Sequence, residues 1–65
     1  MDTTQIRVLL ADDTLIAREG WKKILDPVAD IEIVGEVTNA QEVPARVREL
    51  APDVLLMDLL WLQDE

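Results

Sequence analysis

Three aspartates stand where two apolar runs end, and their side chains could act together. Asp12 and Asp13 directly follow the run Ile6–Ala11, and Asp58 directly follows the run Val54–Met57. Short apolar runs bounded by turn residues favour buried β-strands, as in parallel sheets that helices cover on both faces. In open α/β sheets, ligands bind just outside the carboxyl ends of the strands. We therefore expect the three carboxylates to meet at one rim of a parallel sheet.

Carboxylates gathered in this way favour a particular chemistry. Crowded carboxylates resist ionisation unless a cation neutralises them, and Mg²⁺ typically takes one or two protein carboxylates together with waters and phosphate oxygens. A carboxylate whose charge is screened can act as a nucleophile toward phosphorus. Asp58 is the preferred nucleophile because it stands alone at its strand end, whereas Asp12 and Asp13 are better placed as metal ligands. The alternative is that Asp12 and Asp13 only cap a helix and Asp58 only begins a turn.

The composition excludes several other kinds of site. The chain has no cysteine and no histidine, so disulfides, thiolate chemistry, histidine-bound zinc and Ser-His relays are absent. With 6 basic and 14 acidic residues, the net charge of -8 argues against direct binding of nucleic acid. Residues 1–5 lack the basic and apolar regions of a signal peptide, and no apolar run approaches the ~20 residues that a membrane span needs. The cytoplasm is the expected compartment, with no membrane contact.

The elements between the aspartates alternate in type. Residues 15–25 have helical spacing, with Thr14 or Asp13 as the cap and with Gly20 allowing close packing against the sheet. Residues 31–37 predict a shorter strand of edge character. A second helix is expected from Asn39, its N-cap, with an irregular or delayed first turn because of Pro44. On the first helix we expect one side to be apolar, formed by Leu15, Ile16, Trp21, Ile24 and Leu25. On the second we expect a buried stripe of Val43, Val47 and Leu50, with Arg46, Arg48 and Glu49 facing solvent.

This order predicts two consecutive βαβ crossovers, and such crossovers are right-handed in nearly all known cases. The sequence also resembles a known family, the receiver domains of two-component response regulators, and in particular the subfamily with a LuxR-type helix-turn-helix output domain. The segments that carry the resemblance are Val8–Asp13, Leu15–Gly20, Ile33–Asn39 and Pro52–Leu59.

The resemblance implies a fold and a function. Residues 1–65 would form part of one receiver domain, with three strands, two helices and no second domain. The fold class would be α/β, a βαβαβ portion of a doubly wound flavodoxin-like parallel sheet with strand order 2-1-3, incomplete beside the family's five strands. Asp58 would accept a phosphoryl group from a sensor histidine kinase as an aspartyl phosphate. Asp12, Asp13, Asp58 and the backbone carbonyl of Leu60 would bind Mg²⁺. Such a protein is not an enzyme, beyond assisting its own phosphorylation in a phosphorelay that regulates transcription.

Two other interpretations of the function remain open. Trp61-Leu62 stands where the family has a Met-Pro turn, and the family's later hydroxyl residue and lysine have no counterpart among the 65 residues. The chain could therefore be a pseudo-receiver that only associates with proteins. In the order 2-1-3 the third strand is an edge, so we also expect self-association through that strand or continuation into a longer polypeptide. A haloacid dehalogenase-like phosphatase fits poorly, because those enzymes space their aspartates as Asp-x-Asp.

Overall fold

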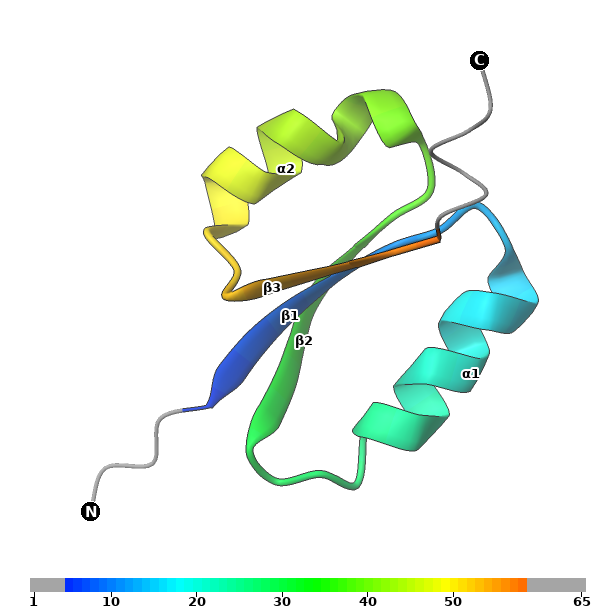
Figure 1. Cartoon of the computed structure of the whole chain (residues 1–65), viewed down its shortest axis with the longest axis vertical. Helices are drawn as coiled ribbons and strands as arrows, with labels where there is room; N and C mark the ends of the chain where they lie inside the picture. The colour runs from blue at the N-terminus through cyan, green and yellow to red at the C-terminus, as the bar shows by residue number, and fades with distance from the viewer. Residues whose placement is uncertain (1–4, 59–65) are drawn as a thin grey trace.

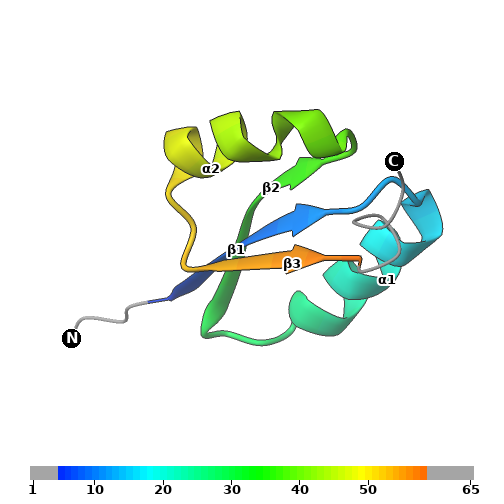
Figure 2. The ribbon, with the colours of Figure 1, turned by 45° about the horizontal axis from the view of Figure 1, so that its top comes forward.

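Three parallel strands form one sheet in a computed structural model that describes residues 5–58. The strand order is β2-β1-β3, as the sequence predicted, with α2 over one face of the sheet and α1 over the other (Figures 1 and 2). No helix among residues 5–58 is long and apolar enough to cross a membrane. The elements in chain order are β1 (Ile6–Ala11), α1 (Leu15–Leu25), β2 (Ile31–Val37), the 3₁₀ turn η1 (Ala40–Glu42), α2 (Val43–Leu50) and β3 (Val54–Met57).

The hydrophobic core lies between the sheet and α2. Side chains alternate between the two faces of a strand, so Leu9 and Ala11 of the central strand point to the same face. Both are fully buried, and with Val37 and Val43 they form a cluster against which Val47, Leu50 and Met57 pack. The buried stripe expected on the second helix is therefore confirmed. Arg46, which was expected to face solvent, is half-buried instead.

Gly35 allows α2 to approach the sheet closely. It pairs with Leu9, just beyond a bulge in the β1–β2 register. A Cβ atom at Gly35 would lie 2.8 Å from Cδ1 of Leu50 and 3.2 Å from Cδ1 of Leu9. The glycine with a packing reason is therefore Gly35. Close packing, one explanation for Gly20, is not supported, since nothing lies within 4 Å of the position its Cβ would take, which leaves chance as the alternative.

The second helix starts late, as the proline predicted. Asn39 caps η1 rather than an α-helix, and its side-chain oxygen accepts a 2.9 Å hydrogen bond from the backbone N–H of Gln41. Pro44 lies in the first turn of α2, where its missing N–H has no intrahelical partner to lose.

Arg7 and Asp53 hold the turn between α2 and β3. The helix ends at Ala51, whose φ of 46° places it in the left-handed region that costs a residue with a side chain about 1–2 kcal/mol. Nη1 of Arg7 donates 2.7 Å hydrogen bonds to the carbonyls of Leu50 and Ala51. The N–H of Arg7 donates to Oδ2 of Asp53 at 2.9 Å, and the N–H of Asp53 donates to the carbonyl of Arg7 at 2.8 Å. These bonds extend the β1–β3 ladder at its amino end and so fix the register of β3.

On the opposite face of the sheet, under α1, Val8 and Leu10 of β1 are also buried. The apolar residues predicted to share one side of α1 do not form a buried face, because no residue of α1 is buried and Leu15, Ile16 and Ile24 are exposed. Arg18 turns toward the sheet instead, and only 14% of its side-chain area is accessible.

The third strand lies at an edge and is less buried than an all-apolar strand suggested. Val54 and Leu55 are exposed, and Leu56 and Met57 are half-buried. Within residues 5–58, β3 pairs with β1 alone. The most buried strand is the central one, β1, whose last four residues are all inaccessible to solvent or nearly so.

Candidate functional site

The register between β1 and β3 places Asp12 beside Asp58. Ala11 pairs with Met57 in the parallel ladder, and each aspartate is the next residue in its strand's direction. Neighbouring strands lie about 4.8 Å apart, so the two residues leave the sheet side by side at its carboxyl edge. The expectation that the first and third strands bring acids to a common rim is met by these two residues.

The two aspartates line the same hollow. It has a volume of about 440 Å³ and lies between the carboxyl ends of β1 and β3 and the first half of α1. Its floor is apolar, and Arg18 is its one basic lining residue among those described. The residues that line it are Leu10, Ala11, Asp12, Ala17, Arg18, Trp21, Leu56, Met57 and Asp58.

Asp12 is held rigidly by hydrogen bonds from three directions. Its N–H donates to the carbonyl of Val37 at 3.0 Å, and its carbonyl accepts from Nη1 of Arg18 at 3.0 Å. Its carboxylate Oδ1 accepts from the N–H of Thr14 at 2.9 Å, which closes an Asx turn. Asp12 is only 7% exposed, and Oδ2 takes no part in these bonds. This side chain can therefore offer one fixed oxygen to the hollow.

The cap expected at the start of α1 takes a different form. Thr14 is the N-cap residue by position, but its side chain makes no capping hydrogen bond. Its hydroxyl instead donates a long bond of 3.3 Å to Oδ1 of Asp13.

Asp13 is exposed and does not line the hollow that contains Asp12 and Asp58. Leu60, whose backbone carbonyl the resemblance adds to the magnesium site, lies outside the described residues, as do Trp61 and Leu62. Of the three predicted acids, the structure thus brings two together. The roles of Asp13 and Leu60 stay predictions.

Two residues of the hollow were not singled out for it from the sequence. From the sequence, Trp21 was placed only on the apolar side of α1, and Arg18 was given no part in the site. Both line the hollow together with Ala17. Positions 17, 18 and 21 have the i, i+1, i+4 spacing of residues on one side of a helix, and this helix begins directly after the acidic turn. The nearness of this face to Asp12 was the signal in the sequence that could have identified them.

The donor set fits magnesium better than a softer metal. Two carboxylates at one rim match the one or two that Mg²⁺ usually takes, and the ion fills its other positions with water and phosphate oxygens. Within residues 5–58 no group of three or more acidic, histidine or cysteine side chains gathers as a metal cage. An ion held by Asp12 and Asp58 would therefore keep open positions for a ligand.

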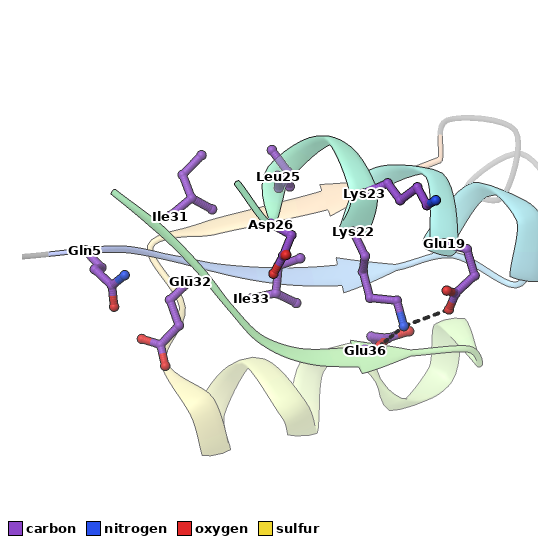
Figure 3. A pocket seen from close by; sticks show the side chains of 10 residues that line it. All are labelled: Gln5, Glu19, Lys22, Lys23, Leu25, Asp26, Ile31, Glu32, Ile33 and Glu36. Atoms are coloured by element: carbon purple, nitrogen blue, oxygen red, sulfur yellow. Dashed lines mark hydrogen bonds and ion pairs between the residues drawn. The ribbon is translucent and has the colours of Figure 1, made fainter. Parts of the chain in front are cut away.

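A larger hollow of about 560 Å³ lies on the other side of α1, against β2 (Figure 3). Lys22 spans it, with Nζ at 2.7 Å from Oε2 of Glu19 and 2.9 Å from Oε2 of Glu36. Nε of Arg18 donates to the other oxygen of Glu36 at 3.0 Å. Glu36 and Lys22 are thus engaged in ion pairs, and no two strand-end aspartates meet in this hollow, so we place the reactive site in the smaller one.

These ion pairs predict how stability depends on pH. Hydrogen bonding from Lys22 lowers the pKa of Glu36 below 4.5, partial burial opposes this, and Arg18 lowers it further. A lowered carboxylate pKa stabilises the fold above the unfolded value, and this stabilisation disappears as the pH falls through the folded pKa. The hydrogen bonds that Lys22 donates to Glu19 and Glu36 raise its pKa above the ordinary 10.5, so its contribution to stability disappears as the pH rises through that raised pKa. We expect Glu36→Gln to flatten the fall in melting temperature below pH 4.5, measured by circular dichroism. Glu49→Gln, at the looser 3.6 Å pair with Arg46, is the control and should leave that fall unchanged.

Comparison with known proteins gives a consistent group of relatives. The chain is 48% identical to the transcriptional regulatory protein BtsR of Escherichia coli strain K12 over 54 residues, which are 83% of this chain and 23% of that protein. It is 46% identical to the response regulator protein VraR of Staphylococcus aureus over 55 residues, which are 85% of this chain and 26% of that protein. The chain thus spans about a quarter of the length of these relatives. No family model matches, and no solved structure matches.

Proposed function

We propose that this chain, a homologue of response regulators, forms part of a receiver domain and accepts a phosphoryl group on Asp58. The donor would be the phosphohistidine of a sensor histidine kinase. Asp12, Asp13, Asp58 and the Leu60 carbonyl would hold a magnesium ion, which would offset the negative charge of the carboxylates and of the incoming phosphoryl group. In this role the protein is a phosphoacceptor of a two-component system and not an enzyme with turnover.

The transfer is a simple displacement at phosphorus. A carboxylate oxygen of Asp58 forms the new O–P bond while the P–N bond to the donor histidine breaks. The electron pair of that bond stays on the histidine nitrogen, and the imidazole, which carries a proton on its other ring nitrogen, leaves as a neutral group.

One observation supports this proposal above the others: Asp12 and Asp58 line one hollow at the carboxyl ends of paired parallel strands. Kinship alone would not argue for a retained site, since a pseudo-receiver has the same ancestry. A hollow that contains both acids, with Asp12 fixed by its own hydrogen bonds, has the arrangement that phosphoryl transfer needs.

Acetyl phosphate with Mg²⁺ tests the proposal directly. We expect intact-mass spectrometry to detect one added phosphoryl group, peptide mapping to place it on Asp58, and Asp58→Asn to reduce labelling to background. Asp53→Asn, at the opposite end of the same strand, is the matched control and should still be labelled. Labelling that persists in Asp58→Asn, or no labelling of the wild type, would contradict the proposal, and turnover of a phosphomonoester would instead indicate a phosphatase.

A second candidate function, association with another protein chain, is favoured by the surface of the molecule. Val54 and Leu55 are exposed on the edge strand, and Leu15, Ile16 and Ile24 are exposed on α1. Edge strands with apolar, uncharged residues invite pairing with another chain. A second copy that pairs antiparallel along β3 would continue the sheet and place both α1 helices on the same face.

The association candidate predicts a dimer that depends on β3. We expect sedimentation velocity of the 65-residue chain to show a fraction of dimer that rises with concentration. A lysine in place of Leu55 should lower that fraction because two like charges would meet at the pairing edge. Ile24→Lys, on α1, separates the contribution of the helix surface from that of the strand. A single monomeric species at every concentration would exclude self-association.

A further inference from the structure

We infer that Arg18 is a positioning residue for the acidic site: its guanidinium ties the Asp12 turn to β2 and thereby fixes the Asp12 carboxylate, which lines the hollow together with Asp58. The expected effect on Mg²⁺ binding rests on the proposed function. The fixing of the Asp12 turn by Arg18 is a property of the chain without any ligand. Arg18 is not assigned a contact with the reacting atoms.

The geometry of Arg18 carries the argument. Nη1 donates to the backbone carbonyl of Asp12 at 3.0 Å, and Nε donates to Oε1 of Glu36 at 3.0 Å. The two acceptors lie on different elements, the turn after β1 and the strand β2. A planar guanidinium presents its donors in a rigid fork, so one side chain sets the distance between these two elements.

Burial makes this link stronger than an ordinary surface ion pair. Only 14% of the Arg18 side chain is accessible, against 33% for Glu36. The carbonyl of Asp12 belongs to a residue that is itself 7% exposed. A charged donor to a partly buried acceptor is stronger than a neutral one, and losing it leaves the acceptor without a partner.

The link reaches the carboxylate through the backbone of the same residue. With its N–H bonded to Val37 and its carbonyl bonded to Arg18, the peptide groups on both sides of Asp12 are fixed. The Asx turn from Oδ1 to Thr14 then orients the side chain. Without Arg18, the following peptide can rotate, and the oxygen offered to the hollow loses its fixed position.

The test compares Mg²⁺ affinity in matched variants, read from the fluorescence of Trp21, which lines the hollow, in a Trp61→Phe background. Partners that orient a metal ligand typically contribute 10–100-fold in affinity, so we expect Arg18→Gln to raise the dissociation constant by on the order of tenfold or more. Glu36→Gln, which releases the other end of the fork, should raise it by a smaller factor. Lys22→Gln removes the second partner of Glu36 without touching Asp12 and should change nothing, as should Arg46→Gln on the other face of the sheet.

Charge and geometry are separated by Arg18→Lys. One ammonium cannot span both acceptors with the same fork, so we expect this variant to bind Mg²⁺ nearly as weakly as Arg18→Gln. Full recovery of affinity in Arg18→Lys would overturn the inference, because positive charge alone would then suffice. If circular dichroism shows that Arg18→Gln does not fold, the Mg²⁺ affinities of Glu36→Gln and Lys22→Gln are compared instead to test the inference. Equal affinities in those two variants would overturn the inference.

A second readout needs no metal at all. Amide hydrogen exchange of the Thr14 N–H reports directly on the Asx turn, and we expect Arg18→Gln to speed it while Arg46→Gln does not. Unchanged exchange in Arg18→Gln would overturn the inference even if the site works. Conversely, a wild-type chain that binds no Mg²⁺ and accepts no phosphoryl group contradicts the proposed function. The exchange rate of the Thr14 N–H would still test whether Arg18 fixes the Asp12 turn.

Discussion

Alanine in place of Leu9 is expected to leave most of the chain unfolded. Leu9 is fully buried on the central strand and belongs to the cluster with Ala11, Val37 and Val43. Replacing a buried leucine by alanine costs about 2–5 kcal/mol, and a core in a chain this small rarely supplies more than about 3–5 kcal/mol. The loss therefore consumes nearly all of the folding free energy. Far-UV circular dichroism and urea titration should show no cooperative transition.

Ile16→Ala is the control for this substitution. Ile16 is an aliphatic residue of similar size that is 81% exposed on α1, so its truncation should change the free energy of unfolding by no more than about 0.5 kcal/mol. If Leu9→Ala melts like the wild type while Ile16→Ala is strongly destabilised, the core lies on the α1 face and the packing described here is wrong.

Asparagine in place of Asp12 is expected to abolish useful binding of Mg²⁺ while preserving the fold. The amide oxygen can still accept the hydrogen bond from Thr14, so the Asx turn survives. The negative charge next to Asp58 is lost. At a few ångströms and partial burial a charge interaction amounts to about 3 kcal/mol, so we expect the dissociation constant to rise on the order of a hundredfold. Isothermal titration calorimetry measures this change, and acetyl phosphate labelling of Asp58 should fall with it.

Two further variants show whether the loss of Mg²⁺ affinity in Asp12→Asn is specific to that residue. Asp30→Asn removes an exposed carboxylate just before β2, at the far edge of the sheet, and should leave Mg²⁺ affinity unchanged. Asp13→Asn decides the role of the neighbouring acid: a loss comparable to that of Asp12→Asn assigns it as a ligand. Equal weakening by Asp30→Asn and Asp12→Asn would contradict a localised site, since binding would then follow net charge alone.

Much of the architecture was predictable because local signals agreed with one another. Ile6–Ala11 and Val54–Met57 are apolar at every position or nearly so, and each is followed by acid, which gave both the strands and the rim where they end. Pro44 predicted the delayed start of α2, and Val43, Val47 and Leu50 predicted its inner face. The order 2-1-3 came from the resemblance to receiver domains, and the strand pairing agrees with it.

The sequence was least informative where contacts between distant segments determine how a side chain packs. Hydrophobic spacing on α1 predicted one apolar side, but Ile16 and Ile24 of that side are exposed, and Arg18 lies toward the sheet with hydrogen bonds to Asp12 and Glu36. The packing role of Gly35 was invisible because it depends on Leu50, fifteen positions later in the chain. The contribution of Arg18 to the site was missed for the same reason, since no local pattern marks a backbone carbonyl as the acceptor.

The central claim is that Asp12 and Asp58 share one ion at the carboxyl edge of the sheet. Titration of the ¹⁵N-labelled chain with Mg²⁺, followed by nuclear magnetic resonance, tests it most directly. We predict that the amide resonances of both aspartates shift together with a single dissociation constant, while those of Arg7 and Asp53 at the opposite edge stay in place. Shifts of Asp12 and Asp58 with different constants, or uniform small shifts at every acidic residue, would contradict it.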